Sequence, residues 1–158
     1  MGLNESVMPV SVAALLLVIV ACAGLEAWLE RQAADARRAS VSFTSIARGT
    51  SSGVAESREI VIESAPDWPA LWAHHAPGTP PPSVDFATEV AVGVLAGERP
   101  SAGYEVDIVA IERHSAETTV VYRLTDPPKD ALVAEMLTSP FHLARLPRQG
   151  LPIRFQRQ

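Results

Sequence analysis

The sequence predicts a mainly β protein, an antiparallel β-sandwich or open barrel with one short helix, preceded by an N-terminal membrane helix or signal segment. Short stretches that alternate between apolar and polar residues recur about every 8–12 residues, as in antiparallel sheets. A single stretch has helical spacing, and only the N-terminal part contains a long uncharged apolar run. We therefore expect an anchor or signal at residues 1–25, a tether at 26–39 and one β domain at 40–158.

The N-terminal apolar run covers residues 8–25 and contains no charged side chain. Its length is at the short end of what crosses a bilayer, so it can act as a membrane helix or as a signal segment. The sequence Ile-Val-Ala-Cys at 19–22 resembles a bacterial lipobox, in which Cys22 would be lipidated. No Lys or Arg precedes the run and arginines follow it, which argues against export. Lipidation and a plain transmembrane anchor are both open alternatives.

The next segments lead into the β domain. Residues 26–39 are rich in Ala, Arg, Glu and Gln, a composition that favours a helical tether without a sustained apolar face. Alternation predicts strands at 41–46 and at 59–63. The serines and glycines between residues 48 and 53 predict a flexible turn that joins these two strands.

The best helix candidate is residues 67–75. Asp67 can cap its N-terminus, and Pro69 is tolerated in a first turn. Trp68 and Trp72 share one face of this helix. Because burial is the dominant energetic use of such large apolar groups, we expect both tryptophans in the core, the alternative being an aromatic platform for a ligand.

The remaining strands follow from alternating apolar residues. Residues 89–96 are apolar on both faces, which predicts a central strand, whereas 104–111 carry Glu105 and Asp107 on one face and should be half exposed. Residues 131–137 also alternate, and either a strand or a helical turn fits them. Further strands are predicted at 118–124, 141–146 and 151–155.

A loop at residues 97–104 joins two of these strands. Gly97 and Gly103 can adopt positive φ near its ends, and Pro100 stiffens its middle. A preorganised loop on a β scaffold is a common binding surface, although Gly and Pro also mark ordinary connections. Both interpretations apply to this loop.

Charge and cysteine content narrow the function. The chain has 13 Lys and Arg against 18 Asp and Glu, a formal net charge of −5. The basic residues are scattered, so nucleic-acid binding is not expected. Cys22 is the only cysteine, so the β domain must be stable without an internal disulfide.

No metal, cofactor or catalytic site is expected. His74 and His75 are neighbours on the predicted helix, where side chains point about 100° apart and cannot converge on one ion. His114 and His142 have no acidic residue or cysteine at ligand spacing, and no serine lies in a strand–turn–helix elbow. Asp85 lies between apolar neighbours before the central strand, and we interpret it as a turn cap.

Five short motifs occur in a characteristic order: SSG at 51–53, two tryptophans at 68–72, PSVDF at 82–86, GERPSAGY at 97–104 and TSPFHL at 138–143. In this order they resemble the C-terminal domain of the PrcB family, the protease-complex subunit family of bacterial envelope lipoproteins. The resemblance implies a non-catalytic accessory protein associated with a secreted protease complex.

This resemblance extends over residues 41–155, almost the whole predicted β domain. Ala102 stands where the family commonly has a second glycine, and Phe141 where it commonly has tyrosine. A shorter stretch, residues 99–104, is similar to the x-Pro-Thr-Thr-Gly-aromatic loop of chagasin-like cysteine protease inhibitors. Arg99 replaces the asparagine of that motif, and the similarity implies protein binding by this loop.

We therefore expect a non-catalytic, membrane-anchored, extracytoplasmic protein of the cell envelope. Its partner would be another protein, a secreted or envelope protease, which it would bind as an accessory or inhibitor-like subunit. The alternative is a β domain that binds a small ligand or an envelope component in a pocket between the tryptophan helix and the sheet. The predicted partner-binding residues are Arg99, Pro100, Ser101, Ala102, Gly103, Tyr104, Ser139, Pro140 and His142.

Overall fold

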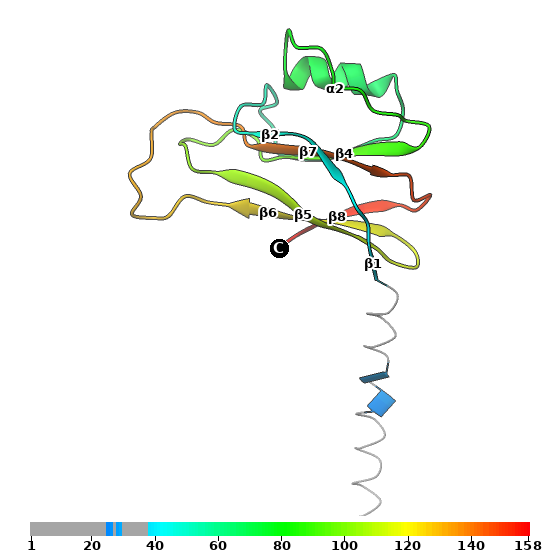
Figure 1. The fold of residues 1–158 in the computed structure, drawn as a ribbon. Coiled ribbons are helices and arrows are strands. Elements are labelled where there is room, and N and C mark those ends of the chain that lie inside the picture. The colour runs from blue at the N-terminus through cyan, green and yellow to red at the C-terminus, as the bar shows by residue number, and fades with distance from the viewer. Residues whose placement is uncertain (1–24, 27, 30–37) are drawn as a thin grey trace, which may run out of the picture. The chain divides into compact units, whose positions relative to one another are not determined.

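The computed structural model describes residues 25, 26, 28, 29 and 38–158 (Figure 1). The chain divides into two compact units, Met1–Arg37 and Arg38–Gln158. In the first unit the four described residues are helical and exposed. Cys22 and the predicted anchor up to residue 24 lie outside the described residues. In the described part of the chain, no helix is both long and apolar enough to cross a membrane.

The second unit is built from two four-stranded sheets and a short helix. Its described elements are β1 (Ala39–Ser40), β2 (Thr44–Gly49), β3 (Arg58–Ile62), α2 (Asp67–His75), β4 (Glu89–Leu95), β5 (Glu105–Arg113), β6 (Thr118–Thr125), β7 (Phe141–Pro147) and β8 (Ile153–Arg157). The strand orders are β1-β5-β6-β8 and β2-β7-β4-β3. Figure 1 shows the sheets stacked, with α2 over the outer face of the second. The mainly β prediction is confirmed, and neither sheet closes into a barrel within these residues.

One strand pair corrects the antiparallel prediction. β6 and β8 pair in parallel, with Thr118 opposite Ile153, whereas every other named pair in the described residues is antiparallel. The reason is the route of the chain. After β6 it crosses to the second sheet, runs through β7 and returns, so β8 enters the first sheet in the same direction as β6.

The strand predicted at residues 41–46 is wrong as a single element. β1 pairs with β5 in one sheet, β2 pairs with β7 in the other, and the chain crosses between the sheets at residues 41–43. Val41 still donates its backbone N–H to Ile111 O at 2.8 Å. β2 then continues through Arg48 and Gly49, where a flexible turn was predicted. Apolar and polar residues continue to alternate through the crossing, because each sheet buries its inner face. The alternation therefore does not show that the chain leaves one sheet and joins the other.

Two apolar layers hold the unit together, one between the sheets and one under α2. The layer between the sheets contains Val90, Val92 and Val94 of β4, Val106, Ile108 and Ile111 of β5, Val120, Ala144 and Leu146. The layer under α2 contains Trp68, Trp72, Ala91, Leu95, Phe141 and Leu143. β4 contributes to both layers, which confirms the prediction of a central strand buried on both faces.

The helix has the predicted bounds and the predicted buried face. Trp68 and Trp72 are 4% and 5% exposed, so their place in the core is confirmed. The cap differs from the prediction, because Pro66 is the N-cap residue and Asp67 is already helical. The Asp67 carboxylate instead accepts a hydrogen bond from the Ser64 hydroxyl.

Asp85 has the predicted structural role. Its carboxylate accepts hydrogen bonds from the Ala87 N–H at 3.1 Å and from the Thr88 hydroxyl at 2.7 Å. The Asp85 backbone carbonyl also accepts from the N–H of Glu89, at 2.7 Å. These bonds close the turn that leads into β4.

Candidate protein-binding surface

The loop at residues 97–104 leaves β4 through a glycine in the left-handed region. Gly97 has φ of +74° and Gly103 has φ of +93°, as expected for both positions. Gly97 is buried against the segment that precedes β3, and Glu98 donates its N–H to Ala55 O at 2.9 Å. The loop base is therefore fixed by backbone contacts from a distant part of the chain.

The middle of this loop is braced by the segment that leads into β7. Arg99 and Thr138 exchange backbone hydrogen bonds of 2.7 and 3.0 Å, and the Thr138 hydroxyl donates to Ser101 O at 2.9 Å. These bonds hold residues 98–101 in one backbone arrangement. The loop is accordingly a preorganised element on the β scaffold.

A second loop, residues 126–137, lies against the first. Ala102 donates its N–H to Ala134 O at 2.9 Å. At Gly103, a Cβ would come within 2.8 Å of Pro127 Cβ, which shows how closely the two loops approach. Residues 97–104 and 126–137 together are called the two-loop surface below.

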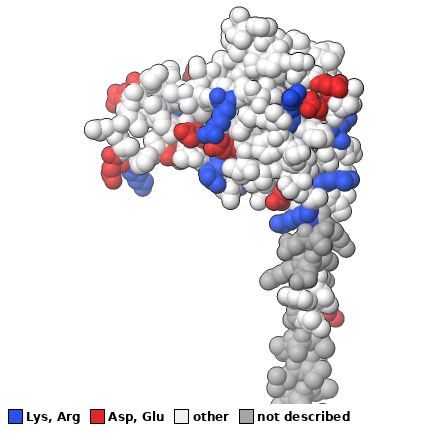
Figure 2. All heavy atoms as spheres, in the orientation of Figure 1, with Lys and Arg blue, Asp and Glu red and all other residues white. Residues whose placement is uncertain are grey.

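Three large apolar side chains of the second loop are exposed. Leu132 is 106% exposed, Leu137 70% and Met136 56%. Figure 1 shows this loop as the orange segment that extends beyond the strands, and Figure 2 shows that end of the domain as mainly uncharged, with acidic and basic groups at its margins. Apolar side chains gathered on an exposed surface are typical of contacts with other proteins.

The strand or helical turn predicted at residues 131–137 is wrong, because the segment has no regular structure. Its alternating apolar residues point to solvent instead of a core. A signal of this was present in the sequence. Asp130 and Glu135 interrupt the apolar pattern, and Pro127 and Pro128 precede it, which disfavours a paired strand.

Arg99 and Tyr104 contact one another across the loop. The guanidinium carbon of Arg99 lies 5.7 Å from the centroid of the Tyr104 ring, within range of a cation–π interaction. Both residues are half-buried, and Arg99 Nε is buried without a hydrogen-bond partner in the described residues. Tyr104 precedes β5, and its ring lies against Arg99.

The other predicted partner-binding residues differ in exposure. Pro100 and Gly103 are exposed, and Ser101 and Ala102 are half-buried. Ser139, Pro140 and His142 are buried, so their side chains offer no surface to a partner. Pro140 O accepts the Ala96 N–H at 2.8 Å, which helps to position the start of the 97–104 loop.

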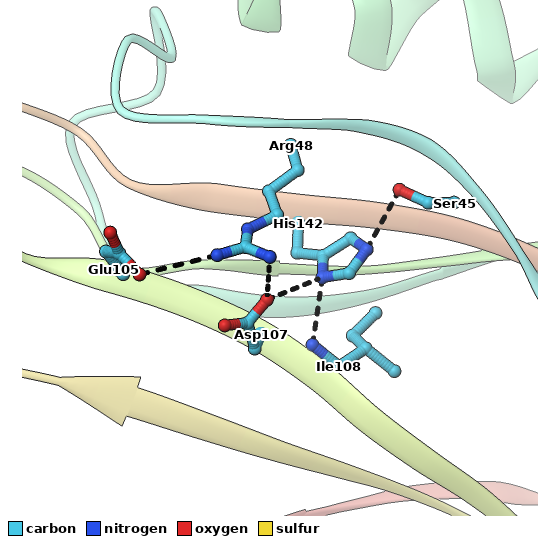
Figure 3. A network of polar contacts seen from close by, with 6 residues as sticks. All are labelled: Ser45, Arg48, Glu105, Asp107, Ile108 and His142. Carbon is cyan, nitrogen blue, oxygen red and sulfur yellow. Dashed lines mark hydrogen bonds and ion pairs between the residues drawn. The ribbon is translucent and has the colours of Figure 1, made fainter.

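His142 joins the two sheets (Figure 3). Its Nδ1 accepts the backbone N–H of Ile108, on the open edge of β5, at 2.9 Å. Its Nε2 lies 3.0 Å from Ser45 Oγ on β2. Arg48, also on β2, reaches the Asp107 carboxylate of β5 at 2.6 Å. One buried imidazole thus satisfies a backbone donor that would otherwise lie unpaired inside the sandwich.

Ser45, His142 and Asp107 are of the residue types that form catalytic triads, but their hydrogen bonds run in the wrong direction. Because Nδ1 accepts the Ile108 N–H, the proton of the neutral ring is on Nε2 and is donated toward Ser45. A triad requires Nε2 to accept the serine proton and Nδ1 to donate to aspartate. Asp107 lies 3.8 Å from Nδ1, beyond hydrogen-bond distance. We interpret the cluster as structural.

Protonation of the two buried histidines opposes folding. Burial lowers the pKa of His142, the Asp107 carboxylate raises it, and the Arg48 guanidinium lowers it, with a net decrease. Burial also lowers the pKa of His75, whose Nδ1 lies 3.0 Å from Ser52 Oγ. Both rings therefore bind protons less readily in the folded chain than in the unfolded chain.

We expect the free energy of unfolding to fall as pH drops below about 6.5, the ordinary histidine pKa of the unfolded chain. Above that pH both rings are neutral in both states and stability is complete. As pH falls toward the lowered pKa values of the folded state, the unfolded chain gains more protons and stability is lost. Urea unfolding at a series of pH values measures this decrease.

The variant His142→Phe separates the contribution of this ring. At neutral pH it should lose about 1–3 kcal/mol, because the buried Ile108 N–H is left without an acceptor. The difference from the unaltered chain should narrow below about pH 6.5, since the variant has no imidazole to protonate at this position. A difference that stays constant across the series would contradict this explanation.

The structure also contains a groove between α2 and β3. It has a volume of about 420 Å³ and is lined by apolar residues of β3 and α2, with Glu56 and Arg58 among its charged residues. A pocket beside the tryptophan helix was expected, but Trp68 and Trp72 lie beneath α2 and do not line the groove. Within the described residues, no three His, Cys, Asp or Glu side chains are grouped so as to hold a metal ion.

A protein-family model described as PrcB C-terminal matches residues 90–147. The matched segment includes nearly all of β4, both loops of the two-loop surface and all of β7. No curated protein and no solved structure matches the chain, so the likeness of residues 99–104 to chagasin-like inhibitors gains no support. Over residues 90–147, the chain is therefore similar to proteins with a PrcB C-terminal domain.

Proposed function

We propose that this protein is a non-catalytic accessory subunit of an envelope protease complex and that it contacts its protein partner through the two-loop surface. The observation that carries the proposal is the exposure of Leu132, Met136 and Leu137 on a loop hydrogen-bonded to the 97–104 loop. The match of residues 90–147 to the PrcB C-terminal family model supports association with a protease complex.

The two loops have complementary properties as a binding surface. Residues 97–104 are braced by backbone hydrogen bonds, so binding costs them little conformational entropy. The second loop supplies apolar area whose removal from water favours association. We also propose that residues 8–25 attach the protein to the envelope membrane, because their sequence is apolar and uncharged. Cell fractionation of the chain with and without residues 1–39 tests this attachment.

The double variant Leu132→Ser with Leu137→Ser should weaken partner binding by about tenfold or more, because a few central apolar contacts dominate most interfaces. The unaltered chain is first immobilised and exposed to an envelope extract, and the retained protease is identified by mass spectrometry. The affinity of that purified protease for the chain and its variants is then measured. Since both leucines are exposed, the urea midpoint should correspond to a stability change within about 0.5 kcal/mol.

The matched control is Val109→Ser, which removes an exposed apolar side chain on β5, away from the two loops. It should leave the affinity unchanged. If no protease is retained by the unaltered chain, the accessory-subunit assignment fails. If the double variant binds the retained protease as tightly as the unaltered chain, the assignment of the surface fails.

A further inference from the structure

β3 forms one edge of the second sheet. Within the described residues it pairs only with β4, from Arg58 opposite Leu95 to Ile62 opposite Ala91. In an antiparallel pair, a strand directs only about half of its backbone donors and acceptors to its neighbour. The other half of the β3 backbone groups therefore faces outward from the sheet.

Other sheet edges in the described residues are covered or guarded. β2, the opposite edge of the same sheet, contacts β5 of the other sheet through the ion pairs of Arg48 with Glu105 and Asp107. β8, an edge of the first sheet, carries Arg154 and Arg157 along its five residues. Charged side chains on an edge strand are a common protection against unwanted pairing. β1, the other edge of the first sheet, is only two residues long. β3 has five residues and carries its charged side chains, Arg58 and Glu59, only at its first two positions, so residues 60–62 leave this edge accessible to another strand.

The side chains of β3 divide between the two faces of the sheet. Val61 packs into the layer between the sheets, and Glu59 faces the same way. The pKa of Tyr122, on β6 of the other sheet, is raised most by burial and next by a hydrogen bond with the Glu59 carboxylate. Arg58, Ile60 and Ile62 all line the groove on the opposite face. The acidic side chain at the second position of β3 thus does not guard the groove.

The groove runs between this strand and α2. Ile60 and Ile62 form its apolar lining on the strand side, and Ala70 and Leu71 form its wall on the helix side. Its volume of about 420 Å³ is large enough for several side chains. α2 is held on the sheet by the buried Trp68, so the wall is formed before any ligand arrives.

We propose that an extended peptide segment of another protein binds here, adding to β3 as a further strand and placing alternate side chains in the groove. The open backbone groups select an extended chain, because only that conformation presents donors and acceptors at matching intervals. The groove lining favours a peptide with apolar side chains at every second position, because Ile60 and Ile62, which line the groove, are also two residues apart. This site is separate from the two-loop surface and goes beyond the function proposed above.

The charge at one end of the groove defines the peptide further. Arg58 is exposed, lines the groove and makes no ion pair with any described residue. An acidic side chain of the peptide over Arg58 gives charge complementarity. Glu56 lies beyond Arg58 at the same end, so the peptide residue that reaches it is not acidic. The expected ligand is an extended segment with two apolar residues and one acidic residue on a single face.

The test uses the full chain and two fluorescein-labelled peptides, Ser-Asp-Thr-Val-Thr-Val-Ser and its reverse sequence. Each places the aspartate and both valines on one face, and together they cover both strand directions. Fluorescence anisotropy should give a sub-millimolar Kd for one of them. N-methylation of either the threonines or the aspartate and valines removes the donors on one edge of the peptide. Only the modification on the edge that pairs with β3 should abolish binding, and which of the two does so depends on strand direction. In hydrogen exchange, the β3 amides directed away from β4 should become slower when the peptide is bound.

Two matched pairs of measurements locate the site. Ala70→Arg fills the groove and should weaken binding by about tenfold or more, whereas Ala73→Arg, on an exposed part of the same helix outside the groove, should leave the Kd within about twofold. Arg58→Glu should weaken binding of the aspartate peptide and favour a peptide with lysine at that position.

The proposal is overturned if neither peptide binds, if Ala70→Arg and Ala73→Arg behave alike, or if an apolar dye enters the groove while both peptides fail. The last result would assign the groove to small ligands. The double variant Leu132→Ser with Leu137→Ser should bind the peptide as tightly as the unaltered chain. A wrong assignment of the two-loop surface is therefore distinguished from a wrong assignment of the β3 groove.

Discussion

Trp72→Ala should lower the free energy of unfolding by about 3–5 kcal/mol, the range measured when large aromatic residues are truncated in protein cores. Trp72 is 5% exposed and lies between Trp68, at 5.2 Å between ring centroids, and His75, at 5.1 Å. Its removal leaves a cavity between α2 and the sheet. Urea unfolding measures the loss, and a change below about 0.5 kcal/mol would show that the ring is not part of the core.

Substitution by phenylalanine separates ring packing from hydrogen bonding. Trp72 Nε1 is buried without a partner in the described residues, so Trp72→Phe loses packing volume but no hydrogen bond. Trp68 Nε1 donates to Pro82 O at 2.8 Å, so Trp68→Phe also leaves that carbonyl without its donor. We expect Trp68→Phe to cost more than Trp72→Phe, by about 1–3 kcal/mol. Equal costs would show that the bond to Pro82 contributes nothing.

Gly97→Ala should destabilise the chain by about 2–4 kcal/mol, from two sources. Gly97 has φ of +74°, a conformation that side chains with a Cβ rarely adopt. An added Cβ would also lie 2.7 Å from Ser57 N and 2.8 Å from Ala55 O. Both contacts are with backbone atoms, which cannot move aside as a flexible side chain could. Urea unfolding gives the size of the effect.

Gly78→Ala is the matched control for Gly97→Ala. Gly78 has φ of +80°, but no atom lies within 4 Å of a Cβ built there. Its substitution should therefore cost only the conformational term, about 1–2 kcal/mol. The difference between the two variants measures the collision of the loop base with the segment before β3. If the two variants lose the same stability, that contact is looser than the structure indicates.

The features that the sequence predicted well depend on a short range along the chain. The helix Asp67–His75 has its predicted bounds, because helical spacing of the tryptophans and the flanking prolines act within one or two turns. β4 is buried on both faces, as its uninterrupted apolar residues indicate. The positive φ values of Gly97 and Gly103 follow from the steric freedom of glycine in a tight connection.

The errors concern contacts between distant segments. Residues 131–137 alternate like a strand, yet they pair with no strand of the described residues and most of their side chains are exposed. Ser139, Pro140 and His142 were predicted to bind a partner, but their side chains are buried in the structure. Periodicity indicates which residues share a face, but whether that face meets a core or solvent depends on what the rest of the chain places against it.

By itself, then, the sequence determined the mainly β class, the tryptophan helix, the central strand and the loop with glycines near its ends, since each depends on local spacing and backbone sterics. Only the tertiary structure decided that the chain changes sheets after β1, that His142 joins the two sheets, and that two loops meet to form one apolar surface. These features arise from hydrogen bonds and packing between residues far apart in the chain, and local periodicity carries no record of which distant segments will pair.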